Sequence, residues 1–172
     1  VDDEHFDRVV LGGICRAKVS VDITTADFKA MLSPTAPNQG RAPSVVQVLA
    51  DLAGRGVEVR LMHAGVPSAA ALRELKGVSH RNLMIRRCPR LHAKSVVIDY
   101  RRAYIGSANL TGAGLGAKHV DRRNIEWGVW TDASKLIDAI ELQFNRLWEG
   151  ERCPSCRLKE RCPVPLEEPS LG

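Results

Sequence analysis

The sequence lacks any uninterrupted apolar run that approaches the roughly 20 residues needed to cross a bilayer. This excludes a protein that spans the membrane through a helix. The first residues also do not resemble a basic secretory leader, because Asp2, Asp3 and Glu4 are acidic. Internal repeats and low-complexity tracts are missing as well. From these absences we expect a cytoplasmic, globular protein.

What the sequence does contain is the composition of a protein with a sizeable core. Of its 172 residues, 44% are apolar and 26% are charged, which is typical of one soluble domain. The 25 Lys and Arg residues exceed the 20 Asp and Glu residues, so the net charge is +5. Acidic and basic residues cancel over 151–172, and the excess therefore lies in 1–150. A basic surplus favours a polyanionic partner such as nucleic acid.

Hydrophobic periodicity predicts alternating helices and strands. The expected helices cover 4–17, 43–54, 68–75 and 136–147, and the expected strands cover 19–23, 57–61, 83–86, 95–99, 103–105 and 124–130. This order predicts an α/β fold with helices layered on a sheet. We divide the chain into a main domain over 1–150, a Cys-rich appendage over 151–162 and a loose tail over 163–172.

The most informative residues form a spaced constellation, which is His92, Lys94, Asp99, Gly106, Ser107 and Asn109. His92 and Lys94 are two positions apart, so on a strand their side chains project from one face. A neutral imidazole can attack phosphorus, while the Lys94 ammonium and the Asn109 amide can stabilise charge on non-bridging phosphate oxygens. Gly106 would let the backbone approach a phosphate closely. The constellation therefore predicts phosphodiester chemistry.

These residues resemble the signature of the phospholipase D superfamily, which is His-x-Lys, four residues, Asp, six residues, Gly-Ser-x-Asn. The order of helices and strands over 1–150 is also similar to the small nucleases of that superfamily that carry one motif. The resemblance implies an α/β/α sandwich, in which a mixed β-sheet is flanked by helices on both faces. It also implies a metal-independent phosphodiesterase, and a nuclease in particular.

The family mechanism implies roles for the matching residues. His92 would form a phosphohistidine, a second His would protonate the leaving oxygen, and water would then release the phosphate, without a cofactor. The family uses two motifs for each active site, and this chain has one. The resemblance therefore implies a homodimer in which two copies of His92 face each other. Glu126 lies where the family has an acidic residue that orients a catalytic His, and Asp99 and Ser107 complete the candidate site.

Several of these positions have a structural alternative. Asp99 could be an ordinary turn residue, and Glu126 could face solvent on a strand. The histidines that match no motif position are expected at the surface or in turns, and they are His5, His63, His80 and His119. The tryptophans are expected to pack in the core rather than to stack on bases, and they are Trp127, Trp130 and Trp148.

Basic residues flank the motif on both sides in the sequence. Any one of them is typically a solvated charge, but around one site of phosphate chemistry they favour a groove for nucleic acid, DNA rather than RNA. The candidate residues of this groove are Arg86, Arg87, Arg90, Arg101, Arg102, Lys118, Arg122 and Arg123.

Three of the five cysteines lie within ten residues, at Cys153, Cys156 and Cys162. An odd count cannot pair completely in internal disulfides, so this spacing favours a metal site over thiols without a metal. A closed structural site needs a fourth ligand, which could be Cys88, Cys15 or a His. We expect structural zinc, with an iron–sulfur cluster as the alternative, because the spacing also resembles the Cys tail of iron–sulfur nucleases. The metal is expected to pin the appendage to the domain, remote from the phosphate chemistry.

Two other functions stay open. A phospholipase or cardiolipin hydrolase would act at a membrane surface and would need an exposed apolar or amphipathic basic stretch beside the site. Residues 110–115 are too small and Gly-rich to supply one. A nucleic-acid-binding subunit of a defence or repair complex would not need the complete motif, and the intact motif favours an enzyme.

Overall fold

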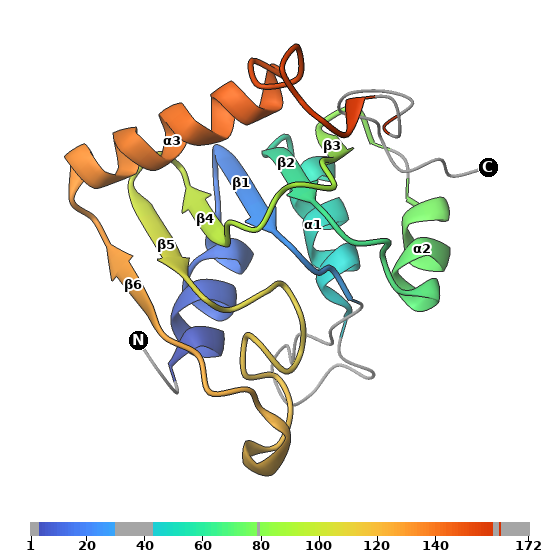
Figure 1. Ribbon diagram of the computed structural model, residues 1–172. Coiled ribbons are helices and arrows are strands. Elements are labelled where there is room, and N and C mark those ends of the chain that lie inside the picture. The colour runs from blue at the N-terminus through green and yellow to red at the C-terminus, as the bar shows by residue number, and fades with distance from the viewer. Residues whose placement is uncertain (1–3, 30–42, 79, 160–161, 163–172) are drawn as a thin grey trace.

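The computed structural model describes residues 4–29, 43–78, 80–159 and 162, so the expected tail over 163–172 lies outside the described residues. Its centre is one six-stranded sheet with the order β3-β2-β1-β4-β5-β6 (Figure 1). The strands are β1 (Ser20–Thr25), β2 (Glu58–His63), β3 (Leu83–Arg87), β4 (Ser95–Ile98), β5 (Arg102–Gly106) and β6 (Gly128–Thr131). β1, β2 and β3 run parallel, whereas the β1–β4, β4–β5 and β5–β6 pairs are antiparallel. The expected mixed sheet is confirmed.

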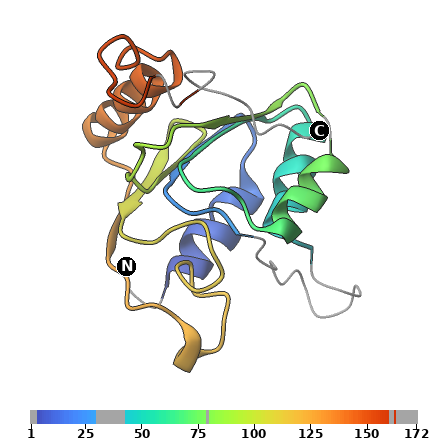
Figure 2. The same ribbon diagram turned by 45° about the vertical axis from the view of Figure 1, so that its right-hand side comes forward.

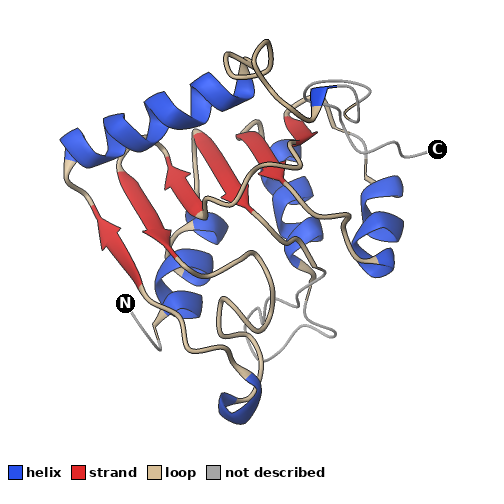
Figure 3. Ribbon diagram, in the orientation of Figure 1, coloured by secondary structure: helices blue, strands red, loops and turns tan. Residues whose placement is uncertain are grey.

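Helices cover both faces of this sheet (Figures 2 and 3). The longer ones are α1 (Val45–Gly54), α2 (Ala69–Lys76) and α3 (Ser134–Trp148), and the shorter ones are η1 (Phe6–Leu11), η2 (Ile14–Arg16) and η3 (Val120–Arg122). One core cluster joins η1, α1 and α2 to one face of the sheet. On the other face, Ile137 and Ile140 of α3 pack on Val97 and Ala103. The expected α/β/α arrangement is confirmed. None of the helices in the described part of the chain has the length and apolar character of a membrane span.

The beginnings of α1 and α2 are determined by their capping residues. The Ser44 hydroxyl accepts a hydrogen bond from the backbone N–H of Gln47 at 3.1 Å, and the Ser68 hydroxyl accepts one from Ala71 at 3.3 Å. Each bond satisfies an N–H group that has no partner inside the helix. Each capping Ser and its partner are only three residues apart in the sequence, so both boundaries could be predicted from the sequence.

The helix expected over 4–17 is broken into two pieces. η1 is a π-helix, η2 is a 3₁₀ helix, and Gly12 and Gly13 separate them. A Cβ atom at Gly13 would collide with the carbonyl of Val9 and the side chain of Ile98. The chain therefore bends at Gly13 because it lies directly against β4, a tertiary contact that the helical periodicity did not reveal.

The strand expected over 124–130 begins later than predicted, at Gly128. The preceding residues bond to the loop after β5 instead of to a strand. The N–H of Asn124 donates to the carbonyl of Ala113 at 3.0 Å, and the N–H of Ser107 donates to the carbonyl of Trp127 at 2.9 Å. These bonds draw 124–127 across the edge of the sheet, where the candidate active site lies.

A buried cluster of charges lies between the sheet and α3. The guanidinium of Arg60 donates from two nitrogens to the carboxylate of Asp22, at 2.6 and 2.7 Å, and from a third to Asn145 at 2.9 Å. Glu141 of α3 is also buried and lies 3.7 Å from Arg60. Burial, and then the carboxylate of Asp22, raise the pKa of Glu141 from 4.5 to about 8.

This raised pKa makes the stability of the fold depend on pH through Glu141. The unfolded chain releases the proton near pH 4.5, while the folded chain holds it to about pH 8. The contribution of protonated Glu141 to the free energy of unfolding is therefore complete below the pKa of the unfolded chain. It is lost as the pH rises through the pKa of the folded chain. We expect the Tm advantage of Glu141→Gln over the wild type to grow from about pH 5 to pH 8 and then to level off. Thermal denaturation across this range, with the exposed Glu149→Gln as control, measures it. A difference in Tm that does not change with pH would contradict the assignment.

Candidate active site

The topology of the sheet brings separate segments to one edge. β4 is antiparallel to both β1 and β5, so the start of β4 lies beside the ends of β1 and β5. β6 is antiparallel to β5, so its start lies at the same edge. His92 and Lys94 precede β4, Ser107 and Asn109 follow β5, and Glu126 precedes β6. The fold therefore brings the segments that carry these five residues to one edge of the sheet, which is the lower edge in Figure 1.

His92 and Lys94 lie together, although in the segment that leads into β4 rather than within the strand. The Lys94 ammonium is 3.2 Å from both ring nitrogens of His92 and donates to the His92 carbonyl at 2.7 Å. The Lys94 carbonyl accepts from the N–H of Gly106 at 3.2 Å, which ties this segment to the end of β5. Burial lowers the pKa of Lys94, and the nearby carboxylate of Glu126 opposes this shift. The imidazole of His92 is exposed and within reach of a substrate.

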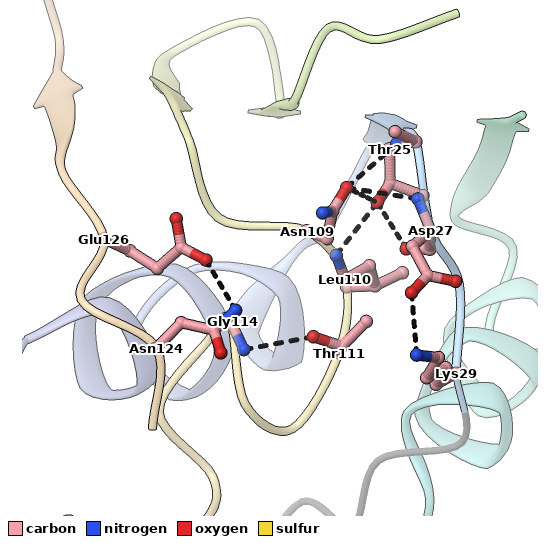
Figure 4. A network of polar contacts seen from close by, with 10 residues as sticks. Thr25, Asp27, Lys29, Asn109, Leu110, Thr111, Gly114, Asn124 and Glu126 are labelled. Carbon is pink, nitrogen blue, oxygen red and sulfur yellow. Dashed lines mark hydrogen bonds and ion pairs between the residues drawn. The ribbon is translucent and has the colours of Figure 1, made fainter. Parts of the chain in front are cut away.

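Asn109 is oriented by the end of β1. Its side-chain oxygen accepts hydrogen bonds from the backbone N–H groups of Ala26 and Asp27, both at 3.1 Å, and lies 3.3 Å from the Thr25 hydroxyl. The same hydroxyl accepts from the N–H of Leu110 at 2.9 Å. These contacts occupy the amide oxygen and leave the amide nitrogen pointing away from β1 (Figure 4). Asn109 can therefore act as a hydrogen-bond donor at this edge.

Glu126 is buried and holds the turn after β5. It accepts a hydrogen bond from the Ser107 hydroxyl at 2.5 Å and another from the Asn124 amide at 3.0 Å, the latter drawn in Figure 4. The Ser107 hydroxyl in turn accepts from the N–H of Trp127 at 3.0 Å. The alternative that Glu126 faces solvent is therefore wrong, because 91% of its surface is covered in this network. Because its carboxylate bonds to Ser107 and Asn124, Glu126 supports the turn in this chain.

Asp99 lies at the opposite edge of the sheet, after the end of β4. Its carboxylate accepts hydrogen bonds from the backbone N–H groups of Lys18, Val19 and Ser20 at 2.7 to 3.1 Å. Asp99 itself has a positive φ of 53°, a conformation that Asp tolerates in tight turns. It clips the β4–β5 turn onto the start of β1, so it is a positioning residue for the motif.

Tyr104 and His5 support the site and were missed by sequence reasoning. The Tyr104 hydroxyl accepts from the N–H of Ala108 at 3.2 Å and lies 3.1 Å from the His5 ring nitrogen. A Cβ atom at Gly106 or Gly128, which face each other in register, would collide with Tyr104. Gly106 therefore makes room for this buried tyrosine, which is a different role from the expected approach to phosphate. Two glycines paired across neighbouring strands indicate that a bulky side chain lies over them. This signal can be recognised only when the register of β5 and β6 is known.

The family of the chain follows from comparison with known sequences. Residues 10–148 match the family described as "Cardiolipin synthase, PLD-like domain". The chain belongs to the phospholipase D-like family. The resemblance noted from the motif is confirmed, and the match lies within the main domain of 1–150. Comparison with curated protein sequences gives no significant match.

Solved structures with the same fold include relatives of this phospholipase D-like chain. NucT from Helicobacter pylori has a TM-score of 0.62 and 17% identity, over 86% of this chain and 89% of NucT. Nuc from Salmonella typhimurium, described as a phospholipase D family member, has a TM-score of 0.59 and 22% identity, over 83% of this chain and 86% of Nuc. The archaeal chromatin protein TrmBL2 has a TM-score of 0.54 and 14% identity, over 86% of this chain and 50% of TrmBL2. These likenesses show the shared fold.

The arrangement of this phospholipase D-like site suits attack on a phosphodiester. An exposed imidazole lies against an ammonium group, and an amide donor is fixed at the same edge. Lys94 and Asn109 can stabilise charge on the phosphate oxygens while His92 approaches the phosphorus. The chain is therefore an enzyme of phosphodiester hydrolysis.

The basic residues are distributed over both edges of the sheet. Arg86 donates to the Trp148 carbonyl at 2.6 Å and lies over its ring, and Arg87 donates to the Ala64 carbonyl at 3.1 Å. Arg101 and Arg102 are exposed, but they lie in the β4–β5 turn at the edge away from His92. Arg101 and Arg102 therefore lie away from the active site, whereas Arg86 and Arg87 are at the end of β3 and are bonded to backbone carbonyls.

The other basic residues lie on segments that reach the active-site edge. Arg90 is exposed and shortly precedes His92, while Lys118 and Arg122 are exposed in the long connection between β5 and β6. Arg123 is half-buried and donates to the Lys118 carbonyl at 2.7 Å. This group contains fewer residues than the set predicted to form the groove.

The histidines and tryptophans outside the motif differ in part from expectation. His63 is fully buried, with its Nδ1 atom 2.8 Å from the Gly65 carbonyl, and His5 is buried too, so the surface placement predicted for both is wrong. Trp148 is buried as expected, and Trp130 packs against the core. Trp127 is 75% exposed, so its predicted core position is wrong.

The cysteines divide into two places. Cys15 packs against the main core, whereas Cys88, Cys153, Cys156 and Cys162 line one cavity. Within the described part of the chain, no disulfide joins any of them. Of the two cysteines predicted as a possible fourth ligand, the cavity favours Cys88.

We predict that Asn109→Asp keeps the fold of this site but loses most of its activity. Asp keeps an oxygen that accepts from Ala26 and Asp27, so the Tm should stay close to that of the wild type. It replaces the amide donor with a negative oxygen, so phosphodiester hydrolysis should fall about 100- to 1,000-fold. Gln47→Glu makes the same amide-to-carboxylate change on the exposed face of α1 and should leave the rate unchanged. Near wild-type hydrolysis by Asn109→Asp would exclude Asn109 as a donor to the reacting phosphate.

Proposed function

We propose that this chain is a nuclease that cleaves DNA through a phosphohistidine on His92, at a site completed by a second copy of the chain. The observation that carries the proposal is the contact of the Lys94 ammonium with the His92 ring, at the same edge as the Asn109 donor. Such a site holds a nucleophile and stabilises the charge of a phosphodiester with side chains alone.

The reaction has two steps. A ring nitrogen of His92 attacks the phosphorus, the bond from phosphorus to the leaving oxygen breaks, and a second imidazolium gives that oxygen a proton. The resulting imidazole then removes a proton from water, which attacks the phosphohistidine and releases the 5′- or 3′-phosphate end. Throughout, Lys94 and Asn109 stabilise the charge on the non-bridging oxygens.

The other histidines of the chain are placed elsewhere, so a second copy of the chain is the source of the second imidazolium. His5 and His63 are buried and bonded to Tyr104 and Gly65, and His119 is paired with Asp121. His80 precedes β3, whose start lies at the opposite edge of the sheet. A twofold axis beside His92 would bring its own copy opposite to it, so that one copy attacks and the other donates the proton. One motif per chain then suffices for a complete site.

An exposed apolar surface beside the site supports this dimer. Ile105 and Val129 face each other in register and are 41% and 52% exposed. They lie on the face of Ala103, beyond the part that α3 covers. Trp127 and Ile125, which are 75% and 89% exposed, lie on the segment that leads into β6. Contiguous apolar patches of this kind mark protein interfaces, and a second copy seated here would lie next to the active-site edge.

Nucleic acid is the substrate that the charges favour. Arg90, Lys118 and Arg122 are exposed cations on the segments that border the site, and phosphate contacts of this kind dominate affinity for DNA. NucT and Nuc share the fold, and TrmBL2 is described as binding DNA in a novel mode. The exposed Ile125 and Trp127 favour one alternative, a phospholipid at a membrane surface. Parallel assays on DNA, RNA and a fluorescent phospholipid separate these substrates.

We predict that purified protein cleaves DNA in the presence of EDTA, and that His92→Ala removes this activity. His92 supplies both nucleophile and acid in the symmetric site, and its exposed side chain makes the fold insensitive to the change. His80→Ala, at a histidine that precedes β3 at the opposite edge of the sheet, should retain wild-type cleavage. An absolute requirement for an added divalent cation, or substantial cleavage by His92→Ala, would contradict the mechanism.

The shared site predicts a specific result for mixed dimers. If wild-type and His92→Ala chains are co-expressed in equal amounts and pair at random, about one quarter of the dimers carry two His92 residues. Cleavage should then fall to about one quarter of that given by the same total amount of wild-type chain. Chains that act independently would give about one half. Light scattering during dilution should show dimers throughout the active range, and a fully active monomer would overturn the shared site.

A further inference from the structure

Four of the five cysteines line one cavity of about 220 Å³ beside the active-site segment. Cys88 comes from the connection between β3 and β4, and Cys153, Cys156 and Cys162 come from the segment after α3. Figure 1 shows the beginning of that segment, in red, continuing from the end of α3. Two parts of the chain that lie far apart in sequence therefore present thiols to the same space.

The backbone after α3 is a succession of turns that aligns its cysteines. Each of four N–H groups donates to the carbonyl three residues earlier, at 2.9, 3.1, 3.1 and 3.3 Å, and they belong to Cys153, Cys156, Lys159 and Cys162. Positions three apart in such turns lie on one face. All four of these residues line the cavity, so the local structure directs three thiols toward Cys88.

The segment carries little else that could hold it in place. Leu158 is the one long apolar side chain between 151 and 159, and it is half-buried against the cavity. A short polar segment gains little free energy from burial of apolar surface. Metal coordination by deprotonated thiols supplies folding free energy to such segments.

We propose that Cys88, Cys153, Cys156 and Cys162 bind one zinc ion, which ties the segment after α3 to the connection that carries His92. A tetrahedral set of four thiolates with Zn–S bonds of about 2.3 Å is the closed form of a structural zinc site. In the described residues no three Cys, His, Asp or Glu side chains are already close enough to hold a metal ion. Coordination therefore requires the thiols to move inward from the cavity walls.

The zinc site borders the active site, which differs from the remote position expected from the sequence. Leu91, His92 and Ala93 form part of the same cavity wall. Cys88 is four residues before His92, so a metal bond at Cys88 restrains the segment that presents the imidazole. His92 and Lys94 are thereby held in the relative position that the reaction needs, and this consequence rests on the proposed function.

The zinc content of the full-length protein tests the site without reference to activity. Protein purified without added metal should contain about one zinc per chain. Cys88→Ser and Cys156→Ser should lose most of it, whereas Cys15→Ser should keep it because Cys15 packs in the main core. Cys156→His keeps a zinc ligand and should retain the ion. Absence of zinc, iron with acid-labile sulfide in its place, or zinc that survives Cys88→Ser would each overturn the proposal.

Hydrogen exchange tests whether the ion holds the active-site segment. Amides of residues 90–93 should exchange faster after zinc is removed from the wild type by a thiol reagent and chelator, and also in Cys153→Ser, but not in Cys15→Ser. Cobalt in place of zinc should give the charge-transfer bands of thiolate coordination in the wild type. Unchanged exchange at 90–93 would overturn the positioning role. Because these measurements need no substrate, a zinc-loaded protein that does not cleave DNA would contradict the proposed function alone.

Discussion

The antiparallel pairing of β4 between β1 and β5 is the constraint on which the site depends. It places the start of β4 beside the ends of its two neighbours. The first half of the motif precedes β4 and the second half follows β5, so the two halves meet at the open end of this hairpin. The same pairing brings the end of β1 to Asn109, whose amide oxygen it occupies. Without this strand order, neither the imidazole nor the amide donor would be oriented toward a common phosphate.

Most of the side chains around the site hold the backbone rather than the substrate. Asp99 clips the far end of β4 onto β1, Tyr104 supports the turn after β5, and Glu126 supports Ser107 in the same turn. Against this rigid frame, His92, Lys94 and Asn109 present the groups that can react or donate. Such a division is expected where reacting groups need accurate placement and supporting residues lock them. Among the described residues, His5, His63 and His119 are bonded to other groups, which is the reason for proposing that a second copy of the chain supplies the other imidazole.

The sequence predicted those parts of the structure that depend on local rules. Ser44 and Ser68 cap their helices over three residues, and strand alternation predicted the α/β fold. The α/β/α sandwich and the roles of the site residues were implied by the resemblance of the motif to the phospholipase D superfamily. The predictions are wrong where contacts between residues distant in sequence determine the local structure. His5 is buried because Tyr104, 99 residues away, bonds to it, and Gly13 bends the first helix because β4 lies against it. Trp127 is exposed because residues 124–127 cross the edge of the sheet. Cys88 lines the cavity and Cys15 packs against the core, a difference that depends on where the fold places each residue.

The central claim is that His92 becomes covalently bonded to phosphorus. Rapid mixing of the enzyme with a short DNA substrate, followed by alkaline denaturation that preserves phosphohistidine and by mass spectrometry of the peptides, tests it most directly. The account predicts a nucleotidyl-phosphate adduct on the peptide that contains His92, which appears before product and disappears as product forms. Product formation with no adduct on His92 at any time, or an adduct on another residue, would contradict the account.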